Sequence, residues 1–248
     1  MDKSFRLRLN RALRSAPDMG AAHVGGEYTP PTAGLARARL VGYFELGTHE
    51  EEYEGKLRDR EKVDLIFELS GPNHEPRKLD DGTLVPIRIT VQETFSLDAK
   101  SNFFKLFQAM NVLGDESHMA YLLGRPFIVE VFHKRSANGK KVYANLKGSN
   151  GYNVCGTTIK DPRTGEEVVI EVAPAVTELK AFIWGGADKE MWDSIYIPGE
   201  YAERRDAQTG HLISPPRSKN VLQERIMSAK NWSSHPLAAI VGTGGELG

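Results

Sequence analysis

The chain has 248 residues, of which 40% are apolar, 26% charged and 8% aromatic, and this is ordinary globular composition. Such a chain can form one or two domains with a full core, which excludes collagenous, purely coiled-coil and wholly disordered proteins. The 32 basic and 33 acidic residues give a formal net charge of −1. Any binding to nucleic acid must therefore come from a local basic patch.

The sequence predicts neither export nor a membrane span. No apolar run approaches the ~20 residues that cross a bilayer, and residues 1–6 lack the apolar core of a secretory signal. Cys155 is the single cysteine, so an internal disulfide and a cysteine-based zinc site are excluded. We expect a protein of a reducing cytoplasm that needs no cofactor.

Three regions follow one another along the chain. Residues 1–27 hold five cations against one acid in their first 14 positions, which is typical of a basic flexible arm; it is either simply solvated or in contact with phosphates. Pro30 and Pro31 give an extended entry into a domain predicted over 28–172. Residues 173–248 are predicted to form a helical C-terminal extension.

Alternation of apolar and polar residues predicts five strands in the 28–172 domain. They cover residues 35–47, 63–69, 85–91, 126–135 and 140–147. In the first strand, Leu40 and Phe44 fall on the core face, whereas Tyr43 falls on the other. Polar residues of both signs predict a loop over 48–61. Asn138-Gly139 is a strong signal for a hairpin between the last two strands.

Helical spacing appears between the third and fourth strands and again near the C-terminus. Phe103, Phe107 and Met110 predict an amphipathic helix over about 98–113, with Asp98 or Ser96 as its N-cap. A short helix is expected over 117–123. A further helix is predicted over 218–232, with Ser218 as a plausible N-cap.

The order of three strands, a helix and a two-strand hairpin is the plan of an OB-fold. We therefore predict a mainly β protein with helices, of the α+β class, built as a five-stranded Greek-key barrel with a helical C-terminal extension. OB-folds bind single strands through a sheet face and two loops. In this chain those loops would be 48–61 and 133–141.

Several runs also carry a family resemblance. They are residues 28–34, 38–47, 66–71, 103–111, 143–146, 192–197 and 218–226. Over about residues 28–232 the chain resembles tailed-bacteriophage single-stranded DNA-binding proteins of the OB-fold type. The resemblance implies sequence-independent binding of single-stranded DNA in phage replication or recombination. Many such proteins recruit partners through an acidic tail, but residues 241–248 hold one acid, so recruitment of this kind is not expected.

Single-strand binding needs cations along a groove and flat side chains on which bases stack. The polar faces and loops of the predicted strands offer these candidates: Arg37, Arg39, Tyr43, Tyr53, Lys56, Arg88, Lys134, Arg135, Lys141 and Tyr143. Tyr43 and Tyr143 are the predicted stacking platforms. Taken singly, each candidate is also typical of a solvated sheet face. Four acids on the same predicted face count against binding: Glu45, Asp64, Glu68 and Glu130.

Enzyme motifs are weak, so catalysis is not expected. The chain has no phosphate-binding glycine loop, no zinc-protease helix and no nucleophile elbow. Asp161-Pro162 with Glu178-Leu179-Lys180 resembles the acid and E-x-K pattern of metal-dependent nucleases, which would hold a hard cation. A plain turn over residues 161–165 explains Asp161 better, so a nuclease is the least favoured alternative. A phage structural or accessory protein without DNA binding is the other alternative.

Trp184, Trp192 and Trp232 are all in the C-terminal extension. We expect them to pack a small helical cap against the barrel. The alternative is that residues 218–232 dock on a phage replication protein or on a second copy of the chain.

Overall fold

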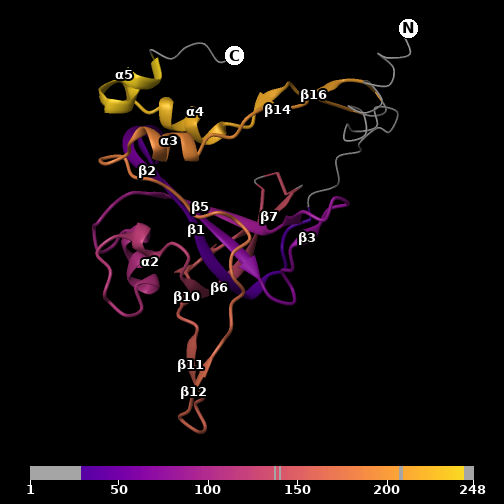
Figure 1. Cartoon of the computed structure of the whole chain (residues 1–248), viewed down its shortest axis with the longest axis vertical. Coiled ribbons are helices and arrows are strands. Elements are labelled where there is room, and N and C mark those ends of the chain that lie inside the picture. The colour runs from indigo at the N-terminus through magenta and orange to yellow at the C-terminus, as the bar shows by residue number, and fades with distance from the viewer. Residues whose placement is uncertain (1–28, 137, 140, 207–208, 243–248) are drawn as a thin grey trace, which may run out of the picture. The chain divides into compact units, whose positions relative to one another are not determined.

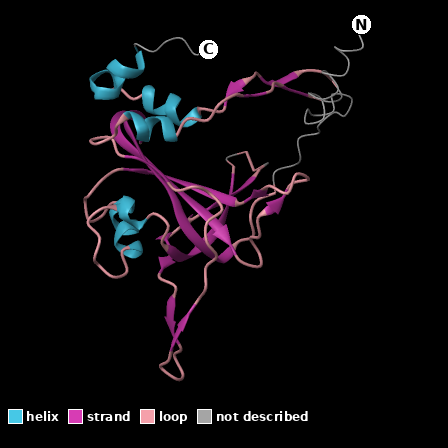
Figure 2. Ribbon diagram, in the orientation of Figure 1, coloured by secondary structure: helices cyan, strands magenta, loops and turns pink. Residues whose placement is uncertain are grey.

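The computed structural model describes residues 29–136, 138–139, 141–206 and 209–242 (Figure 1). The predicted basic arm, 1–27, lies outside them. The chain divides into a larger unit, residues 30–202 and 216–248, and a smaller one, residues 1–29 and 203–215. Strands outnumber helices (Figure 2), which confirms the mainly β class with helices.

One large sheet organises the larger unit. Its strands are β1 (Gly34–Tyr53), β2 (Lys56–Ser70), β5 (Ile87–Thr94), β6 (Pro126–Arg135), β7 (Val142–Asn145), β10 (Val154–Cys155) and β13 (Lys180–Phe182). The order is β10-β6-β1-β2-β5, with β7 paired to β6 and β13 paired to β1. β1 is central, because one edge pairs with β6 over residues 34–39 and with β13 over residues 42–44, whereas the other edge pairs with β2. In the described part of the chain no ladder joins β5 to β7, so hydrogen bonding does not close the sheet.

The predicted loop over 48–61 is wrong. β1 and β2 continue through this region as one long hairpin that turns at Glu54 and Gly55. Both turn residues have positive φ, 52° and 71°, which is the conformation of a two-residue hairpin turn that matches the strand twist. Glu51 lies opposite Arg58 in the ladder, which is a favourable cross-strand charge pair. Glu50 and Asp59 also face each other, and the Lys230 ammonium binds both carboxylates, so a highly charged segment can still form strands.

β1 changes the face that it buries halfway along its length. Ala38 and Leu40 are buried in the main core, and so is Tyr43, which is 0% exposed. The register against β2 shifts between Leu40 and Gly42, and one extra residue reverses the alternation. The prediction that Tyr43 lies on the polar face is therefore wrong. Phe44 points into a second hydrophobic cluster.

Helix α2 (Asn102–Met110) covers one side of the main core by burying Phe103, Leu106 and Met110. It is shorter than predicted, because Ser101 is the N-cap and its Oγ accepts a hydrogen bond from the Phe104 N–H at 3.1 Å. Asp98 instead forms a turn before the helix by accepting from the Lys100 N–H. The 3-10 helix η2 (Met119–Leu122) follows where a short helix was predicted.

The C-terminal elements gather at the end of the β1–β2 hairpin (Figure 2). They are α3 (Lys189–Ser194), α4 (Val221–Met227), the 3-10 helix η3 (Trp232–Ser234) and α5 (Pro236–Gly242). Their apolar side chains, with Trp192 and Trp232 among them, pack on Phe44 and Leu46, and Trp184, which follows β13, joins the same cluster. The expected tryptophan-rich cap is confirmed. The helix predicted over 218–232 is shorter: only α4 forms within it, with Asn220 rather than Ser218 at the N-cap, and η3 begins at Trp232.

Short antiparallel strand pairs complete the fold. In the larger unit they are β3 (Arg77–Lys78) with β4 (Leu84–Val85), β8 (Lys147–Gly148) with β9 (Gly151–Tyr152), β11 (Thr158–Lys160) with β12 (Glu167–Val169), and β14 (Glu200–Tyr201) with β17 (Arg217–Ser218). The smaller unit contains β15 (Arg204–Arg205) with β16 (Leu212–Ser214). Among the described residues, no helix has the length and apolar character that a membrane span requires.

Candidate nucleic-acid interface

The β6–β7 hairpin brings together four of the predicted binding residues. Lys134, Arg135, Lys141 and Tyr143 are all exposed, and the tyrosine is 45% exposed. Lys134 lies opposite Tyr143 in the ladder. Because directly opposed side chains have Cβ atoms about 4.5–5.5 Å apart, a lysine side chain flanks the tyrosine ring. The hairpin thus combines the two features that single-strand binding requires, a stacking surface and nearby cations.

The sequence around this hairpin has a distinctive charge pattern. Residues 131–160 contain no Asp or Glu but six cations: Lys134, Arg135, Lys140, Lys141, Lys147 and Lys160. Lys140 lies outside the described residues. In a chain with a net charge of −1, this segment is a local basic region of the kind that attracts phosphates.

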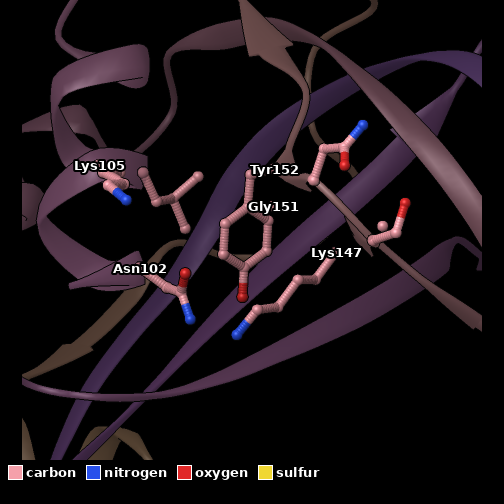
Figure 3. A pocket seen from close by; sticks show the side chains of 9 residues that line it. Asn102, Lys105, Lys147, Gly151 and Tyr152 are labelled. Atoms are coloured by element: carbon pink, nitrogen blue, oxygen red, sulfur yellow. The ribbon is translucent and has the colours of Figure 1, made fainter. Parts of the chain in front are cut away.

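A polar hollow lies between α2 and the β8–β9 hairpin (Figure 3). Asn102 and Lys105 reach it from α2, whereas Lys147, Asn150 and Tyr152 reach it from the hairpin. The alternation of the sequence did not identify these residues. The absence of acids over 131–160 could have pointed to Lys147, but nothing local in the sequence indicates that α2 lies beside this hairpin.

The carboxylate of Glu93 holds one wall of the hollow in place. Its Oε1 accepts from the Lys147 ammonium at 2.6 Å and from the Tyr152 hydroxyl at 2.7 Å. The ammonium also lies 5.7 Å from the centre of the Tyr152 ring. Burial and the Glu93 carboxylate both raise the pKa of Tyr152, so its hydroxyl remains a neutral donor. This network fixes the lysine and the tyrosine ring relative to each other.

A second hollow lies on the other side of the β8–β9 hairpin. It is lined by Glu130 and Phe132 of β6 together with residues 148–153. Phe132 and Lys134 are two positions apart and therefore share a face of β6. This face connects the Lys134–Tyr143 pair to the β8–β9 hairpin. Glu130 is the acid on this path, and its carboxylate accepts from the Asn153 side chain at 2.8 Å.

The tip of the β1–β2 hairpin is less suited to phosphates than predicted. Tyr53 and Lys56 are exposed there, and the Arg58 guanidinium lies 5.6 Å from the centre of the Tyr53 ring. However, residues 48–61 contain six acids and three cations. The resulting negative field opposes the approach of a phosphate backbone.

Two predicted candidates in the first half of β1, Arg39 and Tyr43, have structural roles. Arg39 donates hydrogen bonds to the carbonyl oxygens of Gly124, Val172 and Ala173 at 2.6–2.7 Å. Its guanidinium therefore holds two loops on the strand. The prediction that Arg39 faces solvent as a binding residue is wrong. The aliphatic part of Arg37 is directed toward Gly71. Tyr43 donates from its buried hydroxyl to Glu45 at 3.0 Å, and its position excludes stacking on a base.

The chain's own C-terminal region covers the outer face of β1 and β2. Glu68 of β2 is buried and accepts from the Val176 and Thr177 N–H groups, each at 2.7 Å. Asp64 is also buried and accepts from Arg225 of α4 at 2.7 Å. These two acids, which were expected to repel DNA, instead anchor the covering segment. The predicted binding face of the first strand is thus already occupied.

Arg88 is exposed on β5, opposite Glu68. It lines a groove with Glu178 and Lys180, at the edge of the covering segment. The structure therefore places Arg88 beside an exposed acid rather than in the group of cations on the β6–β7 hairpin.

The nuclease-like residues are not arranged around a common point. Asp161 accepts from the Arg163 and Thr164 N–H groups in the turn between β11 and β12, which is the plain turn considered from the sequence. The Glu178 side chain is 82% exposed and pairs with Lys180 at 3.6 Å. Within the described ranges, no group of three or more His, Cys, Asp or Glu residues could hold a metal ion.

Searches of protein-family models, curated proteins and solved structures found no match to this chain.

Proposed function

We propose that this protein binds single-stranded DNA without sequence preference, through the β6–β7 hairpin and the adjoining β8–β9 hairpin. The observation that carries the proposal is an exposed tyrosine, Tyr143, paired with Lys134 within a 30-residue segment that has no acid. Lysine side chains attract the phosphates through their charge, and the tyrosine offers a stacking face to any base. Neither contact reads base edges, so binding would not depend on sequence.

The arrangement of strands supports an OB-type plan for this unit. β1, β2, β5, β6 and β7 occur in OB order, α2 lies between the third and fourth of them, and β1 pairs with both β2 and β6. Closure would require β5 to meet β7. The two strands lie next to each other, and Glu93 of β5 binds Lys147 just beyond β7. The barrel is thus proposed to close through side chains at this seam. In such a plan the β6–β7 hairpin is one of the two ligand-binding loops.

The biological setting that we propose follows from the resemblance of the sequence. A protein that coats single strands without sequence preference would act in phage DNA replication or recombination, in the host cell cytoplasm. The proposal includes no catalytic step. Phage replication proteins or a second copy of the chain are the partners that this setting would supply.

Substitution of the hairpin lysines tests the proposal. A labelled thymidine oligonucleotide is titrated with the parent protein, with Lys134→Ala and Lys141→Ala, and with Lys78→Ala as a control from an exposed strand of another hairpin. Each hairpin variant should bind more weakly and lose roughly 0.7 from the slope of log K against log salt. The control should match the parent. If the three variants are indistinguishable, the β6–β7 hairpin is not the interface.

A further inference from the structure

The hollow between α2 and the β8–β9 hairpin has the size of a small-molecule site. Its volume is about 460 Å³, within the ~300–1,000 Å³ that small-ligand sites typically occupy. Two walls of different origin form it, one helical and one from the hairpin, as Figure 3 shows. Its lining is mainly polar, with Leu106 and the Tyr152 ring as the apolar surface.

The charges in the lining favour an anion. Lys105 is exposed, and no ion pair reaches it in the part of the chain that the structure describes. The Lys147 ammonium is held by Glu93 but keeps donors to offer, because an ammonium group has three. Asn102 is the first residue of α2, so the positive end of the helix adds to the attraction for a phosphate.

The neutral part of the lining suits a nucleobase. Asn102 and Asn150 carry amide groups that can both donate and accept hydrogen bonds, as the edges of bases require. The Tyr152 ring is fixed from two sides by Glu93 and Lys147, so it is a rigid surface. Asn102 and Lys105 are three residues apart on α2 and therefore face the hollow together.

We propose that this hollow binds one nucleotide, with its phosphate beside Lys105 and Lys147 and its base beside the two asparagines. The inference deepens the proposed function and rests on it, since a single strand lying along the β6–β7 hairpin would supply the nucleotide. A free nucleotide has the same chemistry and is the other source. In either case the phosphate and the base are both required for binding.

Calorimetry on the full chain tests this inference with four probes: dTMP, thymidine, inorganic phosphate and a thymidine oligonucleotide. The parent should bind dTMP more tightly than thymidine or phosphate. Lys105→Ala should weaken dTMP binding about tenfold or more, because a hydrogen bond to a charged group is lost. As a control, Lys189→Ala removes an exposed lysine from helix α3 and should leave the affinity for dTMP unchanged. Asn150→Asp places a carboxylate in the hollow and should also weaken binding.

The outcomes separate this inference from the proposed function. If the parent binds the oligonucleotide but not dTMP, and Lys105→Ala changes neither, the nucleotide site is wrong and the proposed function stands. If dTMP binds in a Lys105-dependent manner but the oligonucleotide does not bind, the hollow is a site for free nucleotides and the proposed function fails. Equal binding of phosphate and dTMP would contradict a role for the base.

Discussion

Tyr143 and Lys134 face each other across the β6–β7 ladder, so a base stacked on the ring would bring its phosphate toward the lysine. This geometry separates two contributions that usually occur together. In the proposed interface the ring would contribute through stacking, which is insensitive to salt, whereas the lysine would contribute through release of counterions.

Tyr143→Ala should therefore weaken single-strand binding by about 1–3 kcal/mol and leave the salt slope nearly unchanged. Tyr53→Ala is the matched control, because Tyr53 is similarly exposed, at 54%, but lies in the acidic tip of the β1–β2 hairpin. Fluorescence anisotropy at several salt concentrations measures both quantities. If Tyr143→Ala binds single strands as tightly as the parent, the Tyr143 ring is not part of the interface.

Tyr43 should affect stability instead of binding. Its ring is completely buried in the main core, so Tyr43→Ala should lower the free energy of unfolding by about 3–5 kcal/mol, as other aromatic truncations do. Tyr43→Phe removes only the hydrogen bond to the Glu45 carboxylate and should cost about 1.5–3 kcal/mol, as the loss of a hydrogen bond to a charged group does. Urea denaturation measures both. Tyr43→Phe should bind DNA like the parent, and weaker binding by this folded variant would contradict the buried assignment.

Asp64 should make stability depend on pH. Burial raises its pKa, and the nearby Arg225 opposes this rise. The native state therefore keeps the Asp64 proton to a higher pH than the unfolded chain does. The stabilisation that this proton binding gives to the native state is present at low pH, and it decreases as pH rises from about 4 through the raised pKa. The unfolding free energy of Asp64→Asn relative to the parent should consequently increase between about pH 4 and pH 7. A constant difference across this range would contradict the assignment.

At the scale of elements, the β1–β2 hairpin is held by contacts that local sequence does not show. Lys230 bonds both Glu50 and Asp59, and Lys62 bonds Glu51. The acidic run at 50–54 has low strand propensity, and its partners are as distant in sequence as Lys230. A window of neighbouring residues therefore predicts a loop where tertiary contacts stabilise strands.

Gly47 in β1 marks where the C-terminal cap meets this hairpin. It has φ of +79°, and a Cβ there would lie 2.3 Å from the Trp184 ring. Gly47→Ala should cost about 2–4 kcal/mol, from the left-handed backbone and the overpacking together. Gly82→Ala is the control, because it has a similar φ of +85° but meets only the end of Lys78 at 4.0 Å. Its cost should be about 1–2 kcal/mol. Equal losses in thermal denaturation would mean that Trp184 does not pack there.

The β6–β7 hairpin shows what alternation can predict. Its outward-facing residues were assigned correctly because β6 has no register shift against β1 or β7. The same reasoning failed for Tyr43, since a bulge in β1 cannot be read from a two-residue period. The hollow beside α2 was missed because it combines residues from 102 to 152, and only the folded chain brings them together.

At the scale of the whole molecule, the C-terminal elements limit the surface that the proposed single strand could reach. They bury Phe44 and Leu46 and, with residues 176–177, cover Asp64 and Glu68 on the outer face of β1 and β2. A strand bound to this protein would therefore avoid the centre of the sheet. It would follow β6, β7 and the β8–β9 hairpin, where the acid-free segment lies.

The central claim, that this chain binds single-stranded DNA electrostatically and by stacking, is tested most directly by one salt titration. The full chain is titrated against a labelled single strand and against a duplex of the same length from low to high salt. We expect single-strand affinity to fall steeply with salt and to exceed duplex affinity throughout, because stacking faces are blocked in a duplex. Equal affinity for the two forms, or no binding at low salt, would contradict the account.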